Sequence, residues 1–476
     1  MKKWIVFICW VFLSVFVHGQ NNPVLYDFTG IPQSLLLNPA AEVDNRWYAG
    51  IPLLSGIRAG AGSNGFSVYD LFADNEVSFS DKVRDLVFRL SSRDVVMVNQ
   101  QLELFNIGFK NNWKGKYYYS FGMYQETDAL MYWPRDLAVL AYEGNRDYLG
   151  KRFDFGHLSG SAEMLTVLHF GVRKKINDRL FVGARAKLYS GMINFSSTGN
   201  SGYFVTETGV ENFYRHRVVS DVVIHTSGYT SLRDIENDGN QVKNGWKELR
   251  SRAFFGGNMG VGLDLGFTYH PHKQWTVTGS LQDLGFIKYK ENVESYSLKG
   301  AYELEGIELV LPSILDDSGA VRDSWEELRE EIEAQLPYKR LHDGYTVIRP
   351  WKLNASVQHA FGIRRNKKRY YLTDYEHHIN TMGAQFFMVN RPHGPLPAIT
   401  GFFSRELSPS ITAKITYTAD KFSKTNIGAG LSAYIKNIHF YVIADNIPGL
   451  FNLAKTHYAA LQLGFNYVFP HFGDPY

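Results

Sequence analysis

Met259-Gly-Val-Gly-Leu-Asp-Leu-Gly-Phe-Thr-Tyr269 is a strand with two unlike faces. One face carries Met259, Val261, Leu263, Leu265, Phe267 and Tyr269, and the other carries Gly260, Gly262, Asp264, Gly266 and Thr268. A period of two predicts a β-strand, and about ten residues is the length that a tilted strand needs to cross a bilayer. The uniform apolar face suits lipid, and the small and polar face suits a lumen. The stretch therefore predicts one strand of a transmembrane β-barrel.

The same alternation recurs along the chain. It predicts about fourteen antiparallel strands, near residues 57–67, 101–110, 116–125, 164–174, 179–190, 257–269, 274–284, 351–361, 379–389, 397–404, 410–418, 426–436, 438–446 and 457–469. Aromatics at 15% and 43 glycines fit such a barrel, although composition alone also permits a secreted β-sandwich or a propeller. No stretch after the first residues is long and apolar enough for a helical span.

The lengths of the connections separate these options. Short connections are predicted at Asn111–Gly115, Lys174–Asp178, His270–Lys273, Glu406–Pro409 and Asn437, and long ones at 126–163, 191–256 and 285–350. Short periplasmic turns and long outer loops are typical of a barrel, and the connection at Arg364–Lys368 is the exception. This order places the C-terminus on the periplasmic side. It leaves Arg46–Leu54 as one strand too many, so residues 20–55 are predicted to plug or line the barrel.

The first residues have the pattern of a secretory signal peptide. Lys2 and Lys3 precede an apolar run, Trp4–Val17, and cleavage is expected before Gln20. A membrane anchor is the alternative, but the run is short for a span. Cys9, the one cysteine, would leave with the signal, so no disulfide or thiolate metal site is expected. The near-neutral charge does not favour nucleic acid. The predicted organisation is signal peptide 1–19, plug 20–55, barrel 56–469 and periplasmic tail 470–476.

The last strand ends in an aromatic pattern. Gln462-Leu-Gly-Phe-Asn-Tyr-Val-Phe469 resembles the β-signal of outer-membrane proteins, in which a polar residue, a glycine and two aromatics recur at fixed spacing. The resemblance implies that the barrel assembly machinery recognises Gln462, Gly464, Tyr467 and Phe469. The tail Pro470–Tyr476 departs from barrels that end on this strand.

A second resemblance lies in the N-terminal region. Gly30-Ile-Pro-Gln-Ser-Leu-Leu-Leu-Asn-Pro-Ala40 and Gly50-Ile-Pro-Leu-Leu-Ser-Gly56 resemble an uncharacterised family of Bacteroidota outer-membrane barrels. The Leu-Asn-Pro-Ala element is similar to PorP/SprF-like and PorV-like proteins of type IX secretion. The strand ends Leu281–Gly285 and Ile443–Asn446 look like the same broad group, which includes FadL-like channels. The resemblance implies the outer membrane of a Gram-negative cell and fixes no substrate.

Several charged residues share the inward parity of their strands. The lumen-facing candidates are Arg173, Arg185, Lys187, Asp264, Lys414, Lys436 and Asp445. They are interpreted as a solvated or salt-bridged lumen. A selectivity ring for anionic solutes is the alternative, and a plug could also fill the lumen entirely.

The sequence offers no convincing catalytic or metal site. His377 and His378 stand beside Asp374 and Glu376, but adjacent strand residues point to opposite faces, so a solvated loop is expected. No hydrolase elbow, zinc-protease motif or phosphate loop occurs. His169, Asp264 and His439 point inward, but no spacing joins them. The protein is therefore predicted to be no enzyme and to bind no cofactor and no metal.

Two helices are predicted in the outer loops. Val321–Leu336 is amphipathic, with an apolar stripe for a lid or a partner and an acidic opposite side. Asp81–Leu90 carries Val83, Leu86, Val87 and Leu90 on one side.

Two functions remain open from the sequence. The first is a non-enzymatic FadL/PorV-like barrel that passes a small or hydrophobic solute, with a hatch at Leu35, Leu36, Leu37, Asn38 and Pro39. The second is a structural or shuttle subunit of an outer-membrane complex of the type IX secretion or gliding type. The expected partners are outer-membrane lipid, the barrel assembly machinery and an outer-membrane protein.

Overall fold

The computed structural model describes residues 22–43, 45–110, 116–209, 214–229, 250–305, 339–363, 378–423 and 426–469. The predicted signal peptide, the helix at 321–336, most of the histidine cluster at 374–378 and the C-terminal tail lie outside these residues. Within them, no helix is long and apolar enough to cross a membrane.

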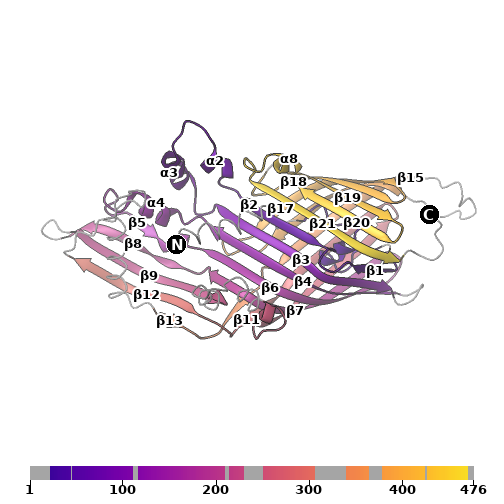
Figure 1. Ribbon diagram of the computed structural model, residues 1–476, viewed down its shortest axis with the longest axis horizontal. Helices are drawn as coiled ribbons and strands as arrows, with labels where there is room; N and C mark the ends of the chain where they lie inside the picture. The colour runs from indigo at the N-terminus through magenta and orange to yellow at the C-terminus, as the bar shows by residue number, and fades with distance from the viewer. Residues whose placement is uncertain are drawn as a thin grey trace, which may run out of the picture.

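The main body is a closed antiparallel barrel with fourteen strands in its wall (Figure 1). In chain order the wall consists of β1 (Trp47–Gly50) together with β2 (Ile57–Ser63), then β3 (Val95–Lys110), β4 (Tyr117–Tyr132), β6 (Gly160–Lys175), β7 (Leu180–Ser197), β10 (Met259–His272), β11 (Trp275–Tyr289), β15 (Lys352–Ile363), β16 (His378–Val389), β17 (Leu396–Ser408), β18 (Ile411–Ala419), β19 (Asn426–Ile435), β20 (Ile438–Asp445) and β21 (Tyr458–Phe469). β21 pairs back to β1 and β2, which closes the wall. The predicted barrel is confirmed, and each predicted strand overlaps one wall strand.

The N-terminal boundary of the barrel differs from the prediction. β1 pairs with β21 and with β3, so Arg46–Leu54 is not excluded from the wall. Gly50 pairs with Asn466 and Ile57 with Leu463, so the chain inserts extra residues between two halves of one wall strand. The parity argument counted two strands where the wall has one interrupted strand. The segment inside the barrel therefore ends near residue 45.

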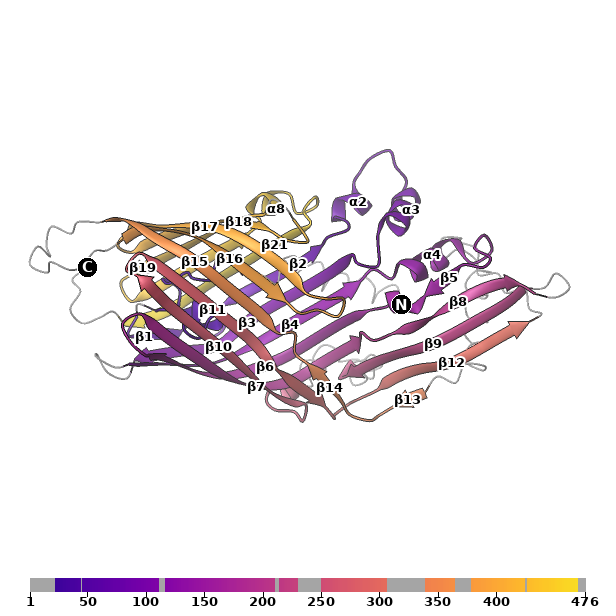
Figure 2. The same ribbon diagram turned by 180° about the vertical axis from the view of Figure 1, so that it is seen from behind.

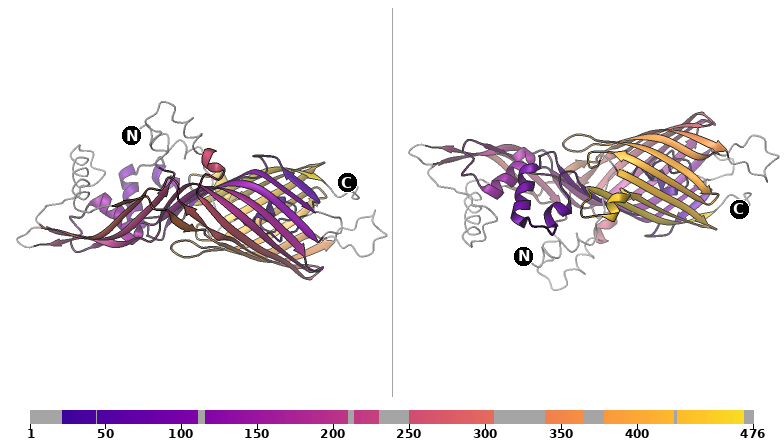
Figure 3. Two further views of the ribbon diagram at one scale, coloured as in Figure 1. Left: turned by 90° about the horizontal axis from the view of Figure 1, so that it is seen from below. Right: turned by 90° about the horizontal axis from the view of Figure 1, so that it is seen from above.

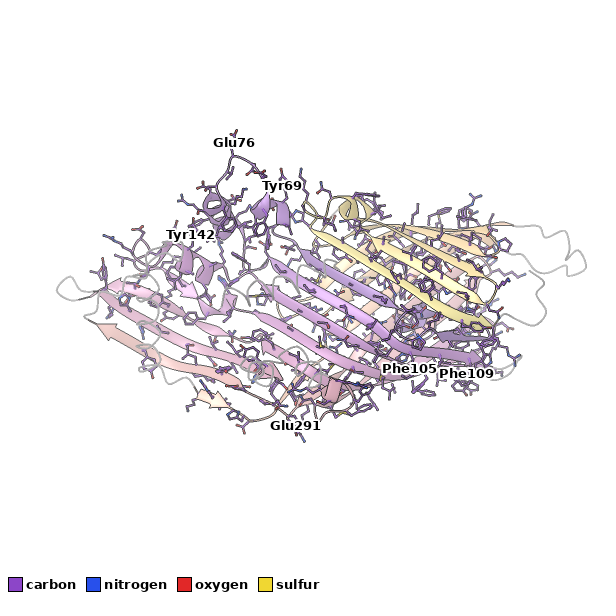
Figure 4. All side chains as sticks on the ribbon, in the orientation of Figure 1. Tyr69, Glu76, Phe105, Phe109, Tyr142 and Glu291 are labelled. Carbon is purple, nitrogen blue, oxygen red and sulfur yellow. The ribbon has the colours of Figure 1, made fainter. Side chains whose placement is uncertain are left out.

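The outward face of the wall is an apolar belt. On β10 the outward Val261, Leu265 and Phe267 are exposed, whereas the inward Asp264 is 0% exposed. Aromatic side chains gather near the hairpin ends of the strands, where Trp47 stacks on Phe109 and Tyr119 stacks on Phe170. Figure 4 shows Phe105 and Phe109 on the outside of β3. An apolar belt with aromatic girdles is the surface that a lipid bilayer requires of a barrel.

The two ends of the wall are unlike. Short hairpins join β6 to β7, β10 to β11, β17 to β18 and β19 to β20 at the end predicted to be periplasmic, which we call the periplasmic end. At the opposite, outer end, strands continue past the wall into a second antiparallel sheet (Figure 2). This outer sheet consists of β5 (Arg152–Asp154), β8 (Ser201–Thr208), β9 (Tyr214–Ser227), β12 (Ser295–Glu305) and β13 (Lys339–Leu341). β7 joins it to the wall by pairing with β9. The described parts of the predicted long loops therefore contain strands as well as connections.

Short helices cover one face of the outer sheet (Figure 3). The described helices are η1 (Pro32–Leu36), α2 (Val68–Phe72), α3 (Phe79–Arg89), α4 (Arg135–Glu143), η2 (Phe155–His157) and α8 (Ile447–Phe451). Val87 of α3 and Val139 of α4 pack with Phe153 and Phe204 of the sheet. The helix predicted at Asp81–Leu90 is confirmed as α3, and the Ser78 hydroxyl caps its first turn by accepting from the Asp81 N–H.

Candidate functional site: the plugged lumen

The segment 22–43 lies inside the barrel and is buried there; we call it the plug. Val24, Phe28 and Ile31 pack against Tyr441 and Ile443 of β20. Two wall glycines allow the backbone of the plug to come close. A Cβ on Gly183 would lie 2.3 Å from the carbonyl of Pro39, and one on Gly266 would lie 2.1 Å from the Asn38 side chain. The plug therefore fits against the wall without space for added atoms at these two positions.

The predicted hatch residues form the part of the plug that faces β7 and β10. Leu35 packs with Tyr48 and Tyr118, whereas Leu36 and Leu37 are only partly buried. The Asn38 carboxamide accepts from the Ala40 N–H at 2.9 Å and donates to the Phe267 carbonyl at 3.3 Å, which holds a turn against the wall. Pro39 is buried in this turn. These residues are therefore packed inside the barrel, and their role as a hatch stays a prediction.

Wall side chains bind the backbone carbonyls of the plug. Arg185 donates to Leu36 at 3.0 Å, and Arg173 donates to Ala41 at 2.9 Å. Lys414 donates to Tyr26, Ser280 to Leu37 and Thr268 to Ala40. Three of the predicted lumen cations therefore bind the plug. These side chains therefore do not form a ring of free positive charge of the kind that an anion filter has.

A chain of ion pairs crosses the lumen on the outer side of the plug. Its contacts are Arg185–Asp264 at 3.2 Å, Lys187–Asp264 at 2.9 Å, Lys187–Asp283 at 2.6 Å, Lys352–Asp283 at 3.0 Å, Lys352–Glu126 at 3.8 Å, Arg349–Glu126 at 3.2 Å and Arg349–Glu163. Cations and carboxylates alternate, so each charge has an opposite neighbour. We call this set the charge chain. Five of its eight members are buried, so removal of a partner there would leave a costly unpaired charge.

The sequence found only the first part of the charge chain. Arg185, Lys187 and Asp264 were predicted, and Asp283 was not, because strict alternation from Leu281 turns it outward. Asp283 has φ 58 at a register shift between β10 and β11, and this bulge points its carboxylate inward. Glu126 and Glu163 lie on parts of β4 and β6 that were assigned to a loop.

The remaining predicted charges lie apart from the charge chain. Asp445 is buried at the outer end of β20, as its inward parity predicts. Lys436 was predicted to face the lumen, and this prediction is wrong. β19 ends at Ile435, and Lys436 occupies the following turn, exposed and with φ 54.

The last strand contributes to the plug as well as to the wall. Gln462 points inward and accepts from the Asn22 side chain at 2.7 Å. Gly464 lies against the backbone of Ser55, while Tyr467 and Phe469 point outward into the belt. Recognition of these four residues by the assembly machinery stays a prediction.

A Ser-His-Asn set lies between the wall and the plug. His439 Nε2 is 2.8 Å from the Ser432 hydroxyl, and its Nδ1 is 3.2 Å from the Asn466 amide. A nucleophile, a base and an orienting group in this order resemble a hydrolase site. However, all three side chains are buried, Gly30 lies over Ser432, and Gln33 pairs with Asn466. The set therefore fastens the plug and offers no path to a substrate.

The other inward residues form no catalytic group either. His169 lies beside the Tyr124 ring, and Asp264 is engaged in the charge chain. Across the part of the chain that the structure describes, no group of three or more His, Cys, Asp or Glu side chains is placed to hold a metal ion.

Two separate cavities flank the plug. The outer cavity has a volume of about 70 Å³, and the charge-chain residues Glu126, Lys187, Asp283 and Lys352 line it together with Leu36 of the plug. The lower cavity has a volume of about 150 Å³ and is lined by hydroxyls and two carboxyls: Thr29, Ser34, Thr268, Thr276, Thr278, Thr381, Asp27 and Glu42. The two cavities share no lining residue. The plug is therefore a partition in a polar lumen.

The outer cavity presents amide groups that have no protein partner. Both polar side-chain atoms of Asn99 and the Nδ2 of Asn354 are buried without a hydrogen bond among the described residues, and both side chains line this cavity. Buried polar groups normally have partners, since desolvation without a hydrogen bond is unfavourable. The cavity is thus suited to water or to a small solute that forms hydrogen bonds.

The loop between β16 and β17 is fastened beside this cavity. Arg391 Nη2 donates to both carboxylate oxygens of Asp128, which lines the cavity, at 2.8 and 3.0 Å. His393 stacks on Tyr132 at 3.9 Å. Burial, and then the positive charge of Lys421, lower the pKa of His393, which favours the neutral ring.

These features define a transmembrane β-barrel whose lumen holds an N-terminal plug. The chain belongs to a family of unknown function, DUF5723, whose model matches residues 39–445. The match includes the end of the plug, most of the wall and the outer sheet.

Comparison with solved structures finds weak similarity to other barrels. The toluene transporter TbuX of Ralstonia pickettii is 10% identical, with 92% of this chain and 94% of that chain covered and a TM-score of 0.41. The toluene transporter TodX of Pseudomonas putida is 9% identical, with 95% and 98% covered and the same TM-score. A FadL homologue of Pseudomonas aeruginosa is 11% identical, with 93% and 95% covered and a TM-score of 0.41. These values are too low to transfer a solute. The search of curated proteins found no match.

Proposed function

We propose that this protein is a non-enzymatic outer-membrane channel for a small polar solute, and that the plug gates it. The observation that carries the proposal is the partition of a polar lumen. Two cavities with polar linings lie on either side of a segment that packs apolar side chains against the wall and whose backbone also accepts hydrogen bonds from wall side chains. Such hydrogen bonds each contribute about 1 kcal/mol net, because water can replace them. The plug can therefore be released while the wall stays closed.

The lining favours a polar solute over a hydrophobic one. Amides and charges line the outer cavity, and hydroxyls line the lower one. An apolar solute on this path would displace water from these groups without replacing its hydrogen bonds.

A disulfide lock tests the gate directly. A Cβ atom added to Gly30 would lie 3.8 Å from the Cβ atom of Ser432. The two Cβ atoms of a disulfide are usually about 3.8 Å apart. In a Cys9→Ser background, Gly30→Cys with Ser432→Cys should bond the plug to β19. We expect planar bilayers to show conductance from the reduced protein, loss of it on oxidation, and its return with reductant. The two single-cysteine variants are the matched controls and should not respond to oxidation.

A second pair of changes tests the gate in the opposite direction. Thr268→Val and Ser280→Ala remove two hydrogen bonds to the plug and leave the charge chain intact. At about 1 kcal/mol each, their loss should raise the open population by about tenfold or more. If this variant, the wild type and the reduced lock all stay silent, the channel proposal fails.

The location has its own test. An apolar belt on a closed wall supports residence in the outer membrane. We expect heat-modifiable gel migration and recovery in the Sarkosyl-insoluble fraction. A fully soluble periplasmic protein would contradict both the location and the channel.

The outer sheet supports a second candidate, a structural or shuttle subunit of an outer-membrane complex of the type IX secretion or gliding type. This sheet and its helices project beyond the wall, where another protein can reach them (Figure 1). Silence in bilayers together with stoichiometric co-purification of another membrane protein would favour this candidate over the channel.

A further inference from the structure

Two short segments lie side by side on the outside of the barrel rim. They are α2, which follows β2, and residues 447–455, which comprise α8 and the turn after it. The Tyr69 N–H donates to the Ala454 carbonyl at 2.7 Å, and the Lys455 ammonium lies 4.4 Å from the centre of the Tyr69 ring. We call these two segments the rim collar. Figure 1 places α8 outside the wall, and the view from above in Figure 3 places it over the near face of the barrel.

The rim collar exposes large apolar side chains. Phe451 is 88% exposed and Phe72 is 69% exposed, and Val68, Tyr69 and Leu453 are also exposed. By contrast, α3 and α4 bury apolar side chains such as Val87 and Val139 against the outer sheet. Exposed apolar side chains that lie together usually mark a surface that contacts lipid or protein.

Hydrogen bonds hold the two segments of the rim collar in the conformation that exposes these apolar side chains. Asn446 adopts φ 56, accepts from the Gly449 N–H and donates to Thr456 and Tyr458 across the base of the loop. In α2, Ser67 and Asp70 form a reciprocal capping box. A loop that is braced at both ends presents Phe451 and Leu453 outward as a stable feature.

The rim collar continues the apolar belt of the wall. α8 contacts β19 and β21, and the outward residues at the outer ends of β18 and β19 are Tyr417 and Ile427, both exposed. On β21, Ala459 points outward by strand alternation but is only 1% exposed. The belt that faces lipid on the wall therefore runs directly into the exposed side chains of the rim collar.

We infer that the rim collar inserts into the interface of the outer leaflet, with Phe451 and Leu453 at the acyl boundary and Tyr69 with Lys455 at the headgroups. Tyrosine is favoured at this level because its ring is apolar and its hydroxyl is polar. A lysine can extend its ammonium to the headgroups while its stem stays with the apolar side chains. The partner is thus the lipid surface itself, and the rim collar would fix the depth and tilt of the barrel in it.

Site-directed spin labelling tests this inference without relying on the channel proposal. In the Cys9→Ser background each variant carries a single cysteine. Phe451→Cys reports on the rim collar, Ile415→Cys on the lipid-facing wall, and Leu149→Cys on the exposed connection between α4 and β5. The labelled full-length proteins are placed in phospholipid vesicles, and the accessibility of each label to oxygen and to a water-soluble nickel chelate is measured.

The expected result is an oxygen-to-nickel accessibility ratio at Phe451→Cys that resembles the ratio at Ile415→Cys and exceeds that at Leu149→Cys severalfold. A ratio like that of Leu149→Cys would place Phe451 in water and overturn the inference. Exclusion of both reagents would also overturn it, because it would show a protein contact, such as a second copy of the chain. The retained ratio at Ile415→Cys verifies in each case that the barrel is inserted.

Discussion

β10 of the wall and β9 of the outer sheet alternate with the same period of two. However, β10 exposes its apolar face, whereas β9 exposes its charged face. On β10 the exposed face is apolar and the buried face carries Asp264. On β9 Val218 packs toward the helices, while Arg215 and Asp221 stand exposed on the other face. The period alone therefore identifies a strand, and the polarity of the exposed face tells whether lipid or water surrounds it.

The ion pairs of the two regions differ in the same way. In the outer sheet Lys299 and Asp221 approach to 2.8 Å, yet both side chains are 57% exposed. In the wall Lys187 and Asp264 approach to 2.9 Å and are almost fully buried. Water screens the first pair, whereas the second pair lies in a buried site where an unpaired charge is costly.

Removing one carboxylate from each region should give the largest difference in stability between the two regions. Asp264→Ala leaves Arg185 with one fewer partner in a buried site and should cost about 3–5 kcal/mol. Asp221→Ala removes an exposed pair and should cost at most about 1 kcal/mol. Urea unfolding of the protein refolded into vesicles measures both. Equal losses would show that the lumen is hydrated enough to screen the charge chain.

A charge placed on each strand gives the next largest contrast. Leu265→Arg puts a cation on the lipid-facing side of β10 and should cost about 2–4 kcal/mol near the bilayer centre. Val219→Arg puts the same group on the charged face of β9 and should change stability by less than about 0.5 kcal/mol. The same unfolding experiment applies. A small effect at Leu265 would mean that this face does not contact lipid.

The contrast also shows what the sequence can and cannot predict. Every wall strand except the β1 part of the first one was predictable, because alternation is a local pattern and each strand carries it independently. The outer ends of β4 and β6 were not, since the alternation there continues past the predicted bilayer length and brings Glu126 and Glu163 to the charge chain. Asp283 was missed because a bulge reverses its direction, a feature with no local signal in this stretch.

The plug illustrates a different limit. Of the predicted plug 20–55, the hatch residues lie inside the barrel, whereas β1 belongs to the wall. Its partners could not be predicted, because Gln33 meets Asn466 and Asn22 meets Gln462 across almost the whole chain length. Such contacts depend on closure of the barrel, which only the complete set of strands determines.

The inner and outer faces of the wall should also differ in their tolerance of a single methyl group, the smallest effect considered. Gly183→Ala places a Cβ 2.3 Å from the Pro39 backbone and should cost about 1–3 kcal/mol, since neither backbone can yield freely. Gly401→Ala on β17 has no atom within 4 Å of the added Cβ and is the matched control. Hydrogen exchange should show faster exchange across residues 22–43 in Gly183→Ala alone, because the added methyl group pushes on the plug and leaves the belt untouched. Equal exchange in the two variants would mean that the plug does not rest on β7 in the membrane, and the polar partition proposed for the lumen would then lose its support.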